Sequence, residues 1–115
     1  MQISKRIIPS WFDVPSAGDG VSFLLAPLTS AQAINVQQEG DSRAGDGFIM
    51  AIQYAVRDWR GIVDENGAPL KFTAKSRDLL FNGDGEEIPG NPLLATAVGV
   101  EIVKRSRMTE TDAKN

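Results

Sequence analysis

Several acidic residues of this chain stand together in two turns, and these turns are the first places where metal chemistry could occur. Residues 64–67 read Asp-Glu-Asn-Gly, and residues 83–91 contain Asp84, Glu86 and Glu87. Carboxylate oxygens are the ligands that calcium prefers. In the first turn, however, the glycine follows Asp64 too soon, and no glutamate stands at the twelfth position of a calcium loop. We therefore expect solvated acidic turns and no bound metal ion.

The chain lacks two residue types on which much acid–base and nucleophilic catalysis depends. It contains no histidine and no cysteine, which excludes Ser-His-Asp and Cys-His catalysis and the thiol and imidazole metal ligands. Adjacent carboxylates do occur, as Asp64/Glu65 and Glu86/Glu87. Neighbours in an exposed turn do not form the buried, mutually perturbed pair that acid–base catalysis uses. No glycine-rich phosphate loop is present either, so the sequence predicts a protein that is not an enzyme and binds no cofactor.

A basic run at residues 104–107 (Lys-Arg-Ser-Arg) is the feature that favours nucleic acid. The whole chain carries a formal net charge of −3, which does not match a polyanion. The run also lies near the end of an expected helix, where Lys104, Arg105 and Arg107 would interact favourably with the helix dipole. We prefer this structural interpretation, and nucleic-acid binding stays the less favoured alternative.

The length and the apolar segments indicate one soluble domain. A chain of 115 residues corresponds to a single domain that can bury a core without a disulfide or a metal. We assign residues 1–105 to this domain and residues 106–115 to a polar, disordered tail. The N-terminus lacks the apolar run of a signal peptide. The longest nearly apolar stretch, residues 93–100, is too short to span a bilayer, so we expect a protein that is not exported and enters no membrane.

Apolar patterning predicts a pair of strands at the N-terminus. The first strand carries Trp11 and Phe12 and is followed by a glycine-containing turn. Residues 21–28 are apolar and partly alternating, and Pro27 stops them as a strand. The two segments are expected to form a short antiparallel hairpin.

Helices are expected after this hairpin. Residues 29–40 begin with a capping box formed by Thr29 and Gln32, and Gly40 is a natural stop. Residues 48–59 give the clearest helix, because their apolar side chains recur at steps of three and four.

The remaining helix ends are also marked in the sequence. Asp46 is the candidate cap of helix 48–59, and Thr73 caps a short helix over residues 74–81. Asn91 followed by Pro92 begins the last helix. The apolar stripe of that last helix is expected to consist of Leu93, Leu94, Ala97, Val98 and Ile102.

We therefore expect an α+β fold, in which a short N-terminal antiparallel β-hairpin packs on three to four α-helices. Helix 48–59 is expected to be central. The candidate core residues are Phe23, Leu25, Ile34, Phe48, Ile49, Ile52, Val56, Trp59, Phe72, Leu80, Leu94, Val98 and Ile102.

The segment after the central helix has the most distinctive sequence. Trp59 ends the helix, and residues 64–67 form a turn whose Asn-Gly pair is its left-handed point. Residues 62–63 and 70–72 can pair briefly across this turn. Trp59 and Phe72 are expected to insert into the core from either side of it.

The order of these features resembles the tail assembly chaperones of long-tailed, non-contractile bacteriophages. In that family a tryptophan, a glycine, an acidic turn, a glycine, a proline and a phenylalanine followed by serine or threonine lie between two helical parts. The strand-to-helix step at residues 26–29 (Ala-Pro-Leu-Thr) is similar as well, and the resemblance extends over residues 20–105. The matching positions are Trp59, Gly61, Asp64, Glu65, Gly67, Pro69, Phe72 and Thr73.

The resemblance implies a small, non-enzymatic chaperone of virion morphogenesis. Such a protein would bind the tape-measure protein in the host cytoplasm, keep it soluble, recruit tail-tube subunits and be absent from the mature virion. It would act in many copies, as a homo-oligomer, and many members also exist as a longer frameshifted form that binds the tube protein. The matched positions would then be structural or partner-binding residues: Trp59, Gly61, Asp64, Gly67, Pro69 and Phe72.

Two alternatives stay open at this point. One is another tail or head–tail morphogenesis component that remains in the virion. The other is a small regulator that binds nucleic acid through residues 104–107.

Overall fold

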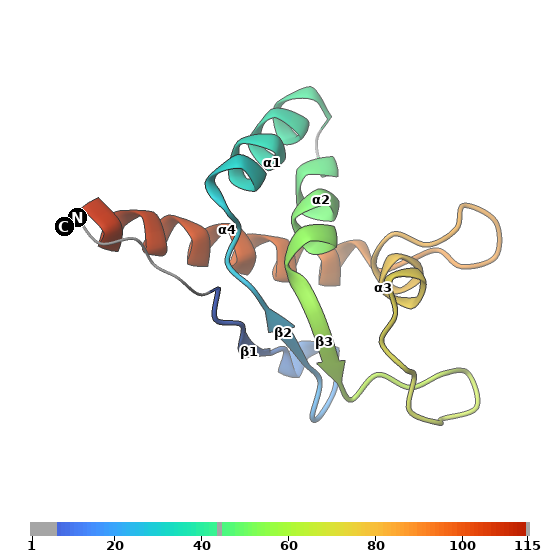
Figure 1. The fold of residues 1–115 in the computed structure, drawn as a ribbon. Helices are drawn as coiled ribbons and strands as arrows, with labels where there is room; N and C mark the ends of the chain where they lie inside the picture. The colour runs from blue at the N-terminus through green and yellow to red at the C-terminus, as the bar shows by residue number, and fades with distance from the viewer. Residues whose placement is uncertain (1–6, 44, 115) are drawn as a thin grey trace.

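The chain folds as an α+β protein with a β-hairpin at its N-terminus, as the sequence predicts (Figure 1). A computed structural model describes residues 7–43 and 45–114, with side chains described as far as residue 106. The elements in this part of the chain are β1 (Ser10–Asp13), a 3-10 turn (Pro15–Ala17), β2 (Ser22–Leu25), α1 (Ser30–Ser42), α2 (Asp46–Ala55), β3 (Val56–Arg60), α3 (Ala74–Phe81) and α4 (Pro92–Lys114).

The strands form one antiparallel sheet in the order β1-β2-β3. Phe12, Phe23 and Trp59 stand opposite one another across the three strands. Directly opposed residues project from the same face of a sheet. Because Phe23 and Trp59 are buried, this face is the one that packs on the helices.

The helix predicted over residues 48–59 is wrong in its last third. Helix α2 ends at Ala55, and the chain continues directly as strand β3. Residues from Val56 onward pair with the free edge of β2, whereas a continued helix would leave the backbone groups of that edge unpaired. Valine and tryptophan also favour strands. The predicted hairpin therefore becomes a three-stranded sheet.

Two glycines allow α1 and α2 to approach each other closely. A Cβ atom on Gly47 would lie 2.9 Å from the carbonyl oxygen of Val36 and 3.1 Å from the Cα atom of Gly40. Gly40 was predicted to stop the helix, but α1 continues past it, and Gly40 instead serves this helix contact. Gly45 occupies the N-cap of α2, and the predicted cap, Asp46, is the first helical residue.

The other helix starts are confirmed. The side chain of Thr29 accepts a hydrogen bond from the backbone N–H of Gln32 at 3.2 Å, and the Gln32 amide oxygen accepts one from the Thr29 N–H at 3.0 Å. Thr73 Oγ1 accepts a bond from the Ser76 N–H at 3.0 Å. Helix α4 begins at Pro92.

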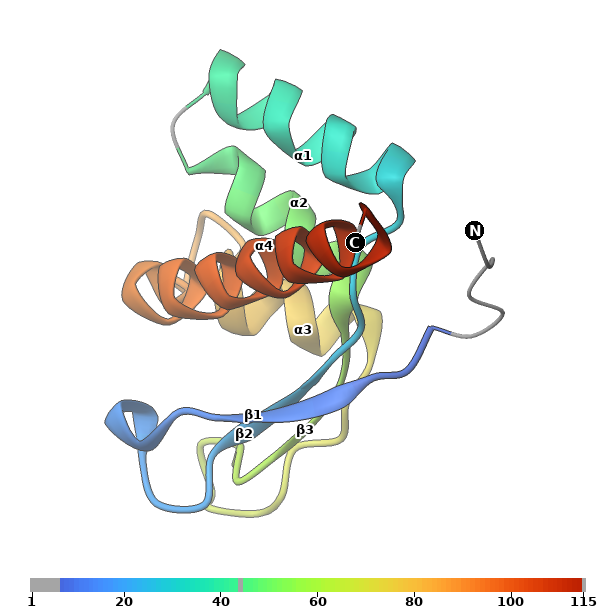
Figure 2. The same ribbon diagram turned by 90° about the vertical axis from the view of Figure 1, so that its left-hand side faces the viewer.

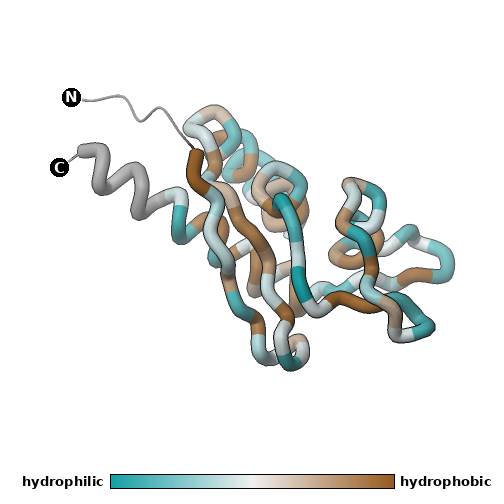
Figure 3. Tube along the Cα trace, turned by 60° about the horizontal axis from the view of Figure 1, so that its bottom comes forward, coloured by the Kyte–Doolittle hydropathy of each residue, from teal (hydrophilic) through white to brown (hydrophobic). Residues whose placement is uncertain are grey.

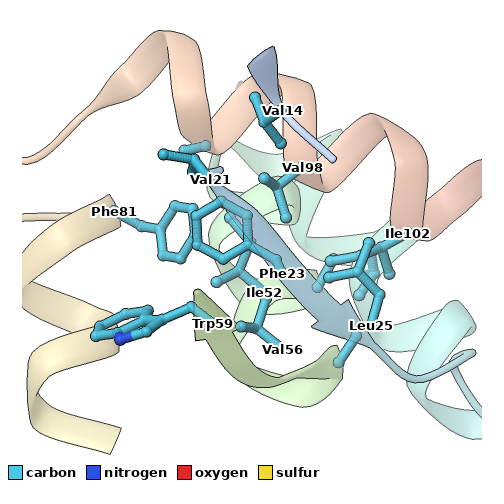
Figure 4. Close-up of a cluster of buried hydrophobic side chains, with 14 residues drawn as sticks. Val14, Val21, Phe23, Leu25, Ile52, Val56, Trp59, Phe81, Val98 and Ile102 are labelled. Atoms are coloured by element: carbon cyan, nitrogen blue, oxygen red, sulfur yellow. The ribbon is translucent and has the colours of Figure 1, made fainter. Parts of the chain in front are cut away.

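The core lies between the inner face of the sheet and helices α2, α3 and α4 (Figure 4). Phe23 is fully buried, with the ring centroids of Trp59 and Phe81 at 6.5 and 5.3 Å. The predicted core residues found buried are Phe23, Leu25, Ile52, Val56, Trp59, Val98 and Ile102. Those that pack against them while partly buried are Ile49, Phe72, Leu80 and Leu94.

Other assignments to the core and to the apolar stripe need correction. Ile34 is 54% exposed, because α1 turns that side towards solvent. On α4, Leu93 and Ala97 are also exposed, so the buried stripe of that helix is displaced from the predicted one. Phe48 is partly buried beside Gly99, where an added Cβ would lie 2.7 Å from the Phe48 Cβ.

Helix α4 runs between the α1–α2 pair and the sheet (Figure 2). It continues to Lys114, so the domain boundary predicted after residue 105 does not coincide with a helix end. The side chains of residues 107–115 lie outside the described part, and the predicted disorder of residues 106–115 stays a prediction. None of the described helices is both long enough and apolar enough to cross a membrane.

Candidate functional site

The connector loop (residues 61–73), which joins β3 to α3, is attached to the core through Trp59. The indole of Trp59 is 6% exposed, and its Nε1–H donates a hydrogen bond to the carbonyl oxygen of Leu70 at 2.8 Å. The Phe72 ring meets it edge-on, with a centroid distance of 5.0 Å. The predicted insertion of Trp59 into the core is confirmed, and the structure brings Trp59 and Phe72 together.

Gly61 is the point at which the connector loop leaves the sheet. Its φ of +78° lies in the left-handed region, and an added Cβ would come within 2.6 Å of the Gly20 carbonyl oxygen. A side chain here would therefore meet both conformational strain and the backbone of the β1–β2 turn. The glycine of the motif is explained by this contact with a segment about forty residues earlier in the chain.

The two halves of the connector loop pair across the turn, as predicted. Val63 and Pro69 form an isolated antiparallel bridge. The Leu70 N–H donates to the Ile62 carbonyl at 2.9 Å, and the Asp64 N–H donates to the Ala68 carbonyl at 2.8 Å. These bonds hold the connector loop in one defined shape.

Asp64 shapes the tip of the connector loop through its side chain. Its Oδ1 atom accepts hydrogen bonds from the backbone N–H groups of Asn66 at 2.9 Å and Ala68 at 3.0 Å. The Gly67 N–H donates to the Asp64 carbonyl at 3.0 Å, and Gly67 has a φ of +81°, the left-handed conformation predicted for the Asn-Gly pair. The carboxylate thus holds the turn together, which is a sufficient reason for an aspartate at this position.

An apolar pair projects from the connector loop on one side. Val63 is 55% exposed, and Pro69, its bridge partner, is exposed as well. Because bridge partners lie on the same face, the two side chains form one small apolar surface, flanked by the exposed Glu65 and Lys71. We call Val63 and Pro69 the loop face. The family motif singled out Pro69 and passed over Val63. The predicted pairing of residues 62–63 with residues 70–72 was the signal that pointed to Val63, and the observed bridge places it opposite Pro69.

The second acidic loop is organised in the same way. Asp84 Oδ1 accepts hydrogen bonds from the backbone N–H groups of Glu86, Glu87 and Ile88 at 2.8–3.0 Å. The bonds from Glu86 and Ile88 are the largest causes that hold the pKa of Asp84 below its ordinary value, because they stabilise the charged form. Among the described residues, no group of three or more potential ligands is placed to hold a metal ion. Figure 3 shows that the tips of both acidic loops are hydrophilic.

One residue of the basic run at residues 104–107 makes structural hydrogen bonds within the protein. Arg105 Nε donates to Glu101 Oε1 at 3.1 Å, and its Nη1 donates to the Ser10 carbonyl at 3.1 Å and to Ser10 Oγ at 2.8 Å. A weaker bond of 3.4 Å joins Nη2 to the Trp11 carbonyl. Lys104 is exposed, and the side chain of Arg107 lies outside the described part. Arg105 therefore anchors strand β1 to α4.

The matched positions of the family motif fall into two groups. Trp59, Gly61 and Phe72 attach the connector loop to the body of the protein, whereas Asp64 and Gly67 shape its tip. Pro69 lies on the loop face. The chain matches no family model, no curated protein and no solved structure.

Proposed function

We propose that this protein is a tail assembly chaperone of long-tailed, non-contractile bacteriophages. It binds the tape-measure protein in the host cytoplasm, keeps it soluble during tail morphogenesis and is absent from the mature virion. The observation that carries the proposal is the connector loop. The motif positions that suggested the family all serve this one loop. Trp59 and Gly61 attach it to the body of the protein, Asp64 shapes its tip, and Pro69 lies on the loop face.

The loop face has the properties of a small site for an apolar partner. The hydrogen-bonded pairing of the connector loop and the Trp59 anchor hold the face in place before binding, which lowers the entropy that binding costs. Val63 and Pro69 offer apolar surface, and a tape-measure protein, as the family resemblance implies, is a long helical client with apolar stripes. A helix that buries such a stripe needs a complementary apolar surface.

One loop face is too small to bind a client tightly. A surface of two side chains lies far below the area that stable protein–protein interfaces bury. Many copies along one long client would add their contributions through avidity. The proposed role therefore includes self-association into a homo-oligomer, and the net charge of −3 favours the solubility of such a coat.

Recruitment of tail-tube subunits completes the proposed role. The family resemblance assigns this step to a longer frameshifted form that carries a tube-binding extension.

The nucleic-acid alternative has less support after the structure is known. Arg105 is bound to Glu101 and to the backbone of β1, so it is not available as a phosphate contact without loosening that strand. The other alternative, a component of the finished virion, is separated from a chaperone by mass spectrometry of purified particles. A chaperone is absent from them, whereas a virion component is present.

Co-expression with a tape-measure protein of such a phage tests the proposal. We expect the chaperone to raise the soluble fraction of the client and to co-purify with it. The variant Val63→Asp should lose most of this effect, because it places a charge on the loop face. Ile34→Asp is the matched control, since Ile34 on α1 is exposed to nearly the same extent, 54% against 55%, and should behave like the unaltered protein. A client that stays insoluble with the unaltered chain would refute the proposal.

A further inference from the structure

Helix α4 carries an exposed apolar stripe on the side that faces away from the core. Leu93 is 87% exposed and Val100 is 48% exposed, and Ala97 lies exposed between them. Leu93 is the most exposed large hydrophobic residue in the described part of the chain. The spacing of four and then three residues places all three side chains on one face of the helix. We call these three residues the α4 stripe.

The two ends of the α4 stripe carry opposite charges. Lys104, four residues beyond Val100, continues the same face and is exposed. At the other end, the loop that precedes α4 carries the exposed carboxylates of Glu86 and Glu87, and Figure 1 shows this loop beyond the start of the helix. Within the described residues, neither Lys104 nor these two glutamates forms an ion pair. The surface is therefore apolar in the middle, acidic at one end and basic at the other.

We propose that the α4 stripe binds a second copy of this chain, through an antiparallel pair of α4 helices related by a two-fold axis near Ala97. In that arrangement Leu93 of each copy packs on Val100 of the other. Lys104 then lies near the start of α4 of the other copy, on the side of the loop that carries Glu86 and Glu87. A two-fold axis repeats each contact, so the apolar pair and the charge attraction each form twice.

Charge and side-chain size select the antiparallel orientation. A parallel pair would place the glutamates of the two copies together and the lysines together, which is unfavourable. In the antiparallel pair, the small side chain of Ala97 lies near the axis and lets the helices approach to about 8 Å. The sequence spacing of 93, 97, 100 and 104 is also the seven-residue pattern of helices that pair along a seam.

The dimer rests on the proposed function in that it supplies an interface for the self-association included there, but its formation does not depend on the client. It would form in the isolated chain, and the loop face lies on a different segment and stays free to bind. A failure of dimerisation would leave the weak binding of single loop faces to the client in place, and a failure of client binding would leave the dimer in place. The two proposals are therefore tested separately.

Cysteine cross-linking tests the orientation, because the chain contains no cysteine of its own. The full chain is prepared as Leu93→Cys and as Val100→Cys, and each is oxidised alone and in a mixture. We expect disulfide-linked dimers in the mixture and almost none with either variant alone. In the antiparallel pair, equivalent residues 93 lie seven residues apart along the axis, about 10 Å, which exceeds the Cα separation that a disulfide spans. Efficient cross-linking of each variant with itself would overturn the proposal.

Sedimentation equilibrium measures the strength of the dimer. Leu93→Glu should raise the dimer dissociation constant by roughly 100-fold, because each copy loses one buried leucine. Leu93 is exposed in the single chain, so the fold, followed by circular dichroism, should not change. Ile34→Glu, on the surface of α1, is the matched control and should leave the constant unchanged. A monomer at high micromolar concentration, or equal effects of both variants, would overturn the proposal.

A charge exchange provides the most specific measurement. Lys104→Glu should weaken the dimer, and the combination of Lys104→Glu with Glu86→Lys and Glu87→Lys should restore it. Within one chain, residues 92 and 104 lie about 18 Å apart along α4, and the loop with Glu86 and Glu87 lies beyond the start of the helix (Figure 1), so the exchanged charges can attract each other only between copies. If the combined variant dimerises no better than Lys104→Glu alone, the proposed pairing is wrong.

Discussion

The indole N–H of Trp59 donates a hydrogen bond to the carbonyl oxygen of Leu70 at 2.8 Å. This bond joins the last strand of the sheet to the second half of the connector loop. Since Leu70 in turn donates its N–H to Ile62, one buried side chain holds both halves of the loop. The shape of the loop face therefore depends on a residue that is itself hidden from any partner.

Replacement of Trp59 should separate the packing of its ring from its hydrogen bond. Trp59→Ala is expected to lower the free energy of unfolding by about 3 kcal/mol or more, because it leaves a cavity beside Phe23 and Phe72. Trp59→Phe should cost about 1–2 kcal/mol, since it keeps an aromatic ring and removes the donor to Leu70. Urea unfolding followed by circular dichroism measures both values. Equal losses for the two variants would show that the ring contributes nothing beyond the bond.

Gly61→Ala should destabilise the protein more than Gly67→Ala. Both glycines have left-handed φ values, +78° and +81°, so both variants carry about the same backbone strain of roughly 1 kcal/mol. Only at Gly61 would the new Cβ meet another backbone, at 2.6 Å from the Gly20 carbonyl oxygen, whereas nothing lies within 4 Å at Gly67. The difference in melting temperature between the two variants reports this close approach. If Gly67→Ala is the more damaging change, the described packing of Gly61 on the β1–β2 turn is wrong.

Arg105→Ala should loosen strand β1 from the body of the protein. The guanidinium bonds to the Ser10 and Trp11 carbonyls and to Glu101 are lost together, and we expect a cost of about 1–2 kcal/mol. Amide hydrogen exchange should quicken in residues 10–13 more than in α2. Arg105→Lys should not restore protection, because an ammonium cannot reproduce the planar set of donors. Lys75→Ala, at an exposed position on α3, is the control and should change neither measurement.

The acidic loop before α4 should lose stability in strong acid because of Asp84. Its folded-state pKa lies below the ordinary value of 3.8, chiefly through the backbone hydrogen bonds from Glu86 and Ile88. Its stabilising contribution is therefore fully present above that ordinary value and is lost as the pH falls through the lower, folded-state pKa. Asp84→Asn should remove this part of the pH dependence.

Thermal melts of the protein at neutral pH and in strong acid measure the Asp84 effect. The unaltered chain should lose more stability on acidification than Asp84→Asn does. The control Glu65→Gln removes an exposed charge from the connector loop while keeping the three hydrogen bonds to Asp84. It should keep the dependence of the unaltered chain, and a loss of pH dependence in the control would contradict the assignment to Asp84.

Features that depend on neighbouring residues were predictable from the sequence. The capping box of Thr29 and Gln32, the cap at Thr73 and the turn at Gly67 all formed as expected. Each of them is a hydrogen bond or a backbone conformation within a few residues, so its energy does not depend on the rest of the fold. The same local pattern identified the connector loop and its buried Trp59.

The end of α2 was not predictable in this way. Residues 56–59 continue the helical spacing of apolar residues, yet they form a strand because the edge of β2, more than thirty residues earlier, offers them backbone partners. Helix propensity is a weak preference that such pairing overrides. The sheet, and with it the place where Trp59 stands opposite Phe23, required the tertiary arrangement.

The sequence by itself determined the α+β class, the N-terminal hairpin, the helix starts and the absence of histidine and cysteine chemistry. The tertiary structure decided which apolar residues are buried and which are left for partners. Leu93 and Leu94 are adjacent and chemically identical, but one is 87% exposed and the other packs on the core. The reason is that a helix has several possible apolar faces, and only the segments that pack against it, brought from elsewhere in the chain, select the one that is covered.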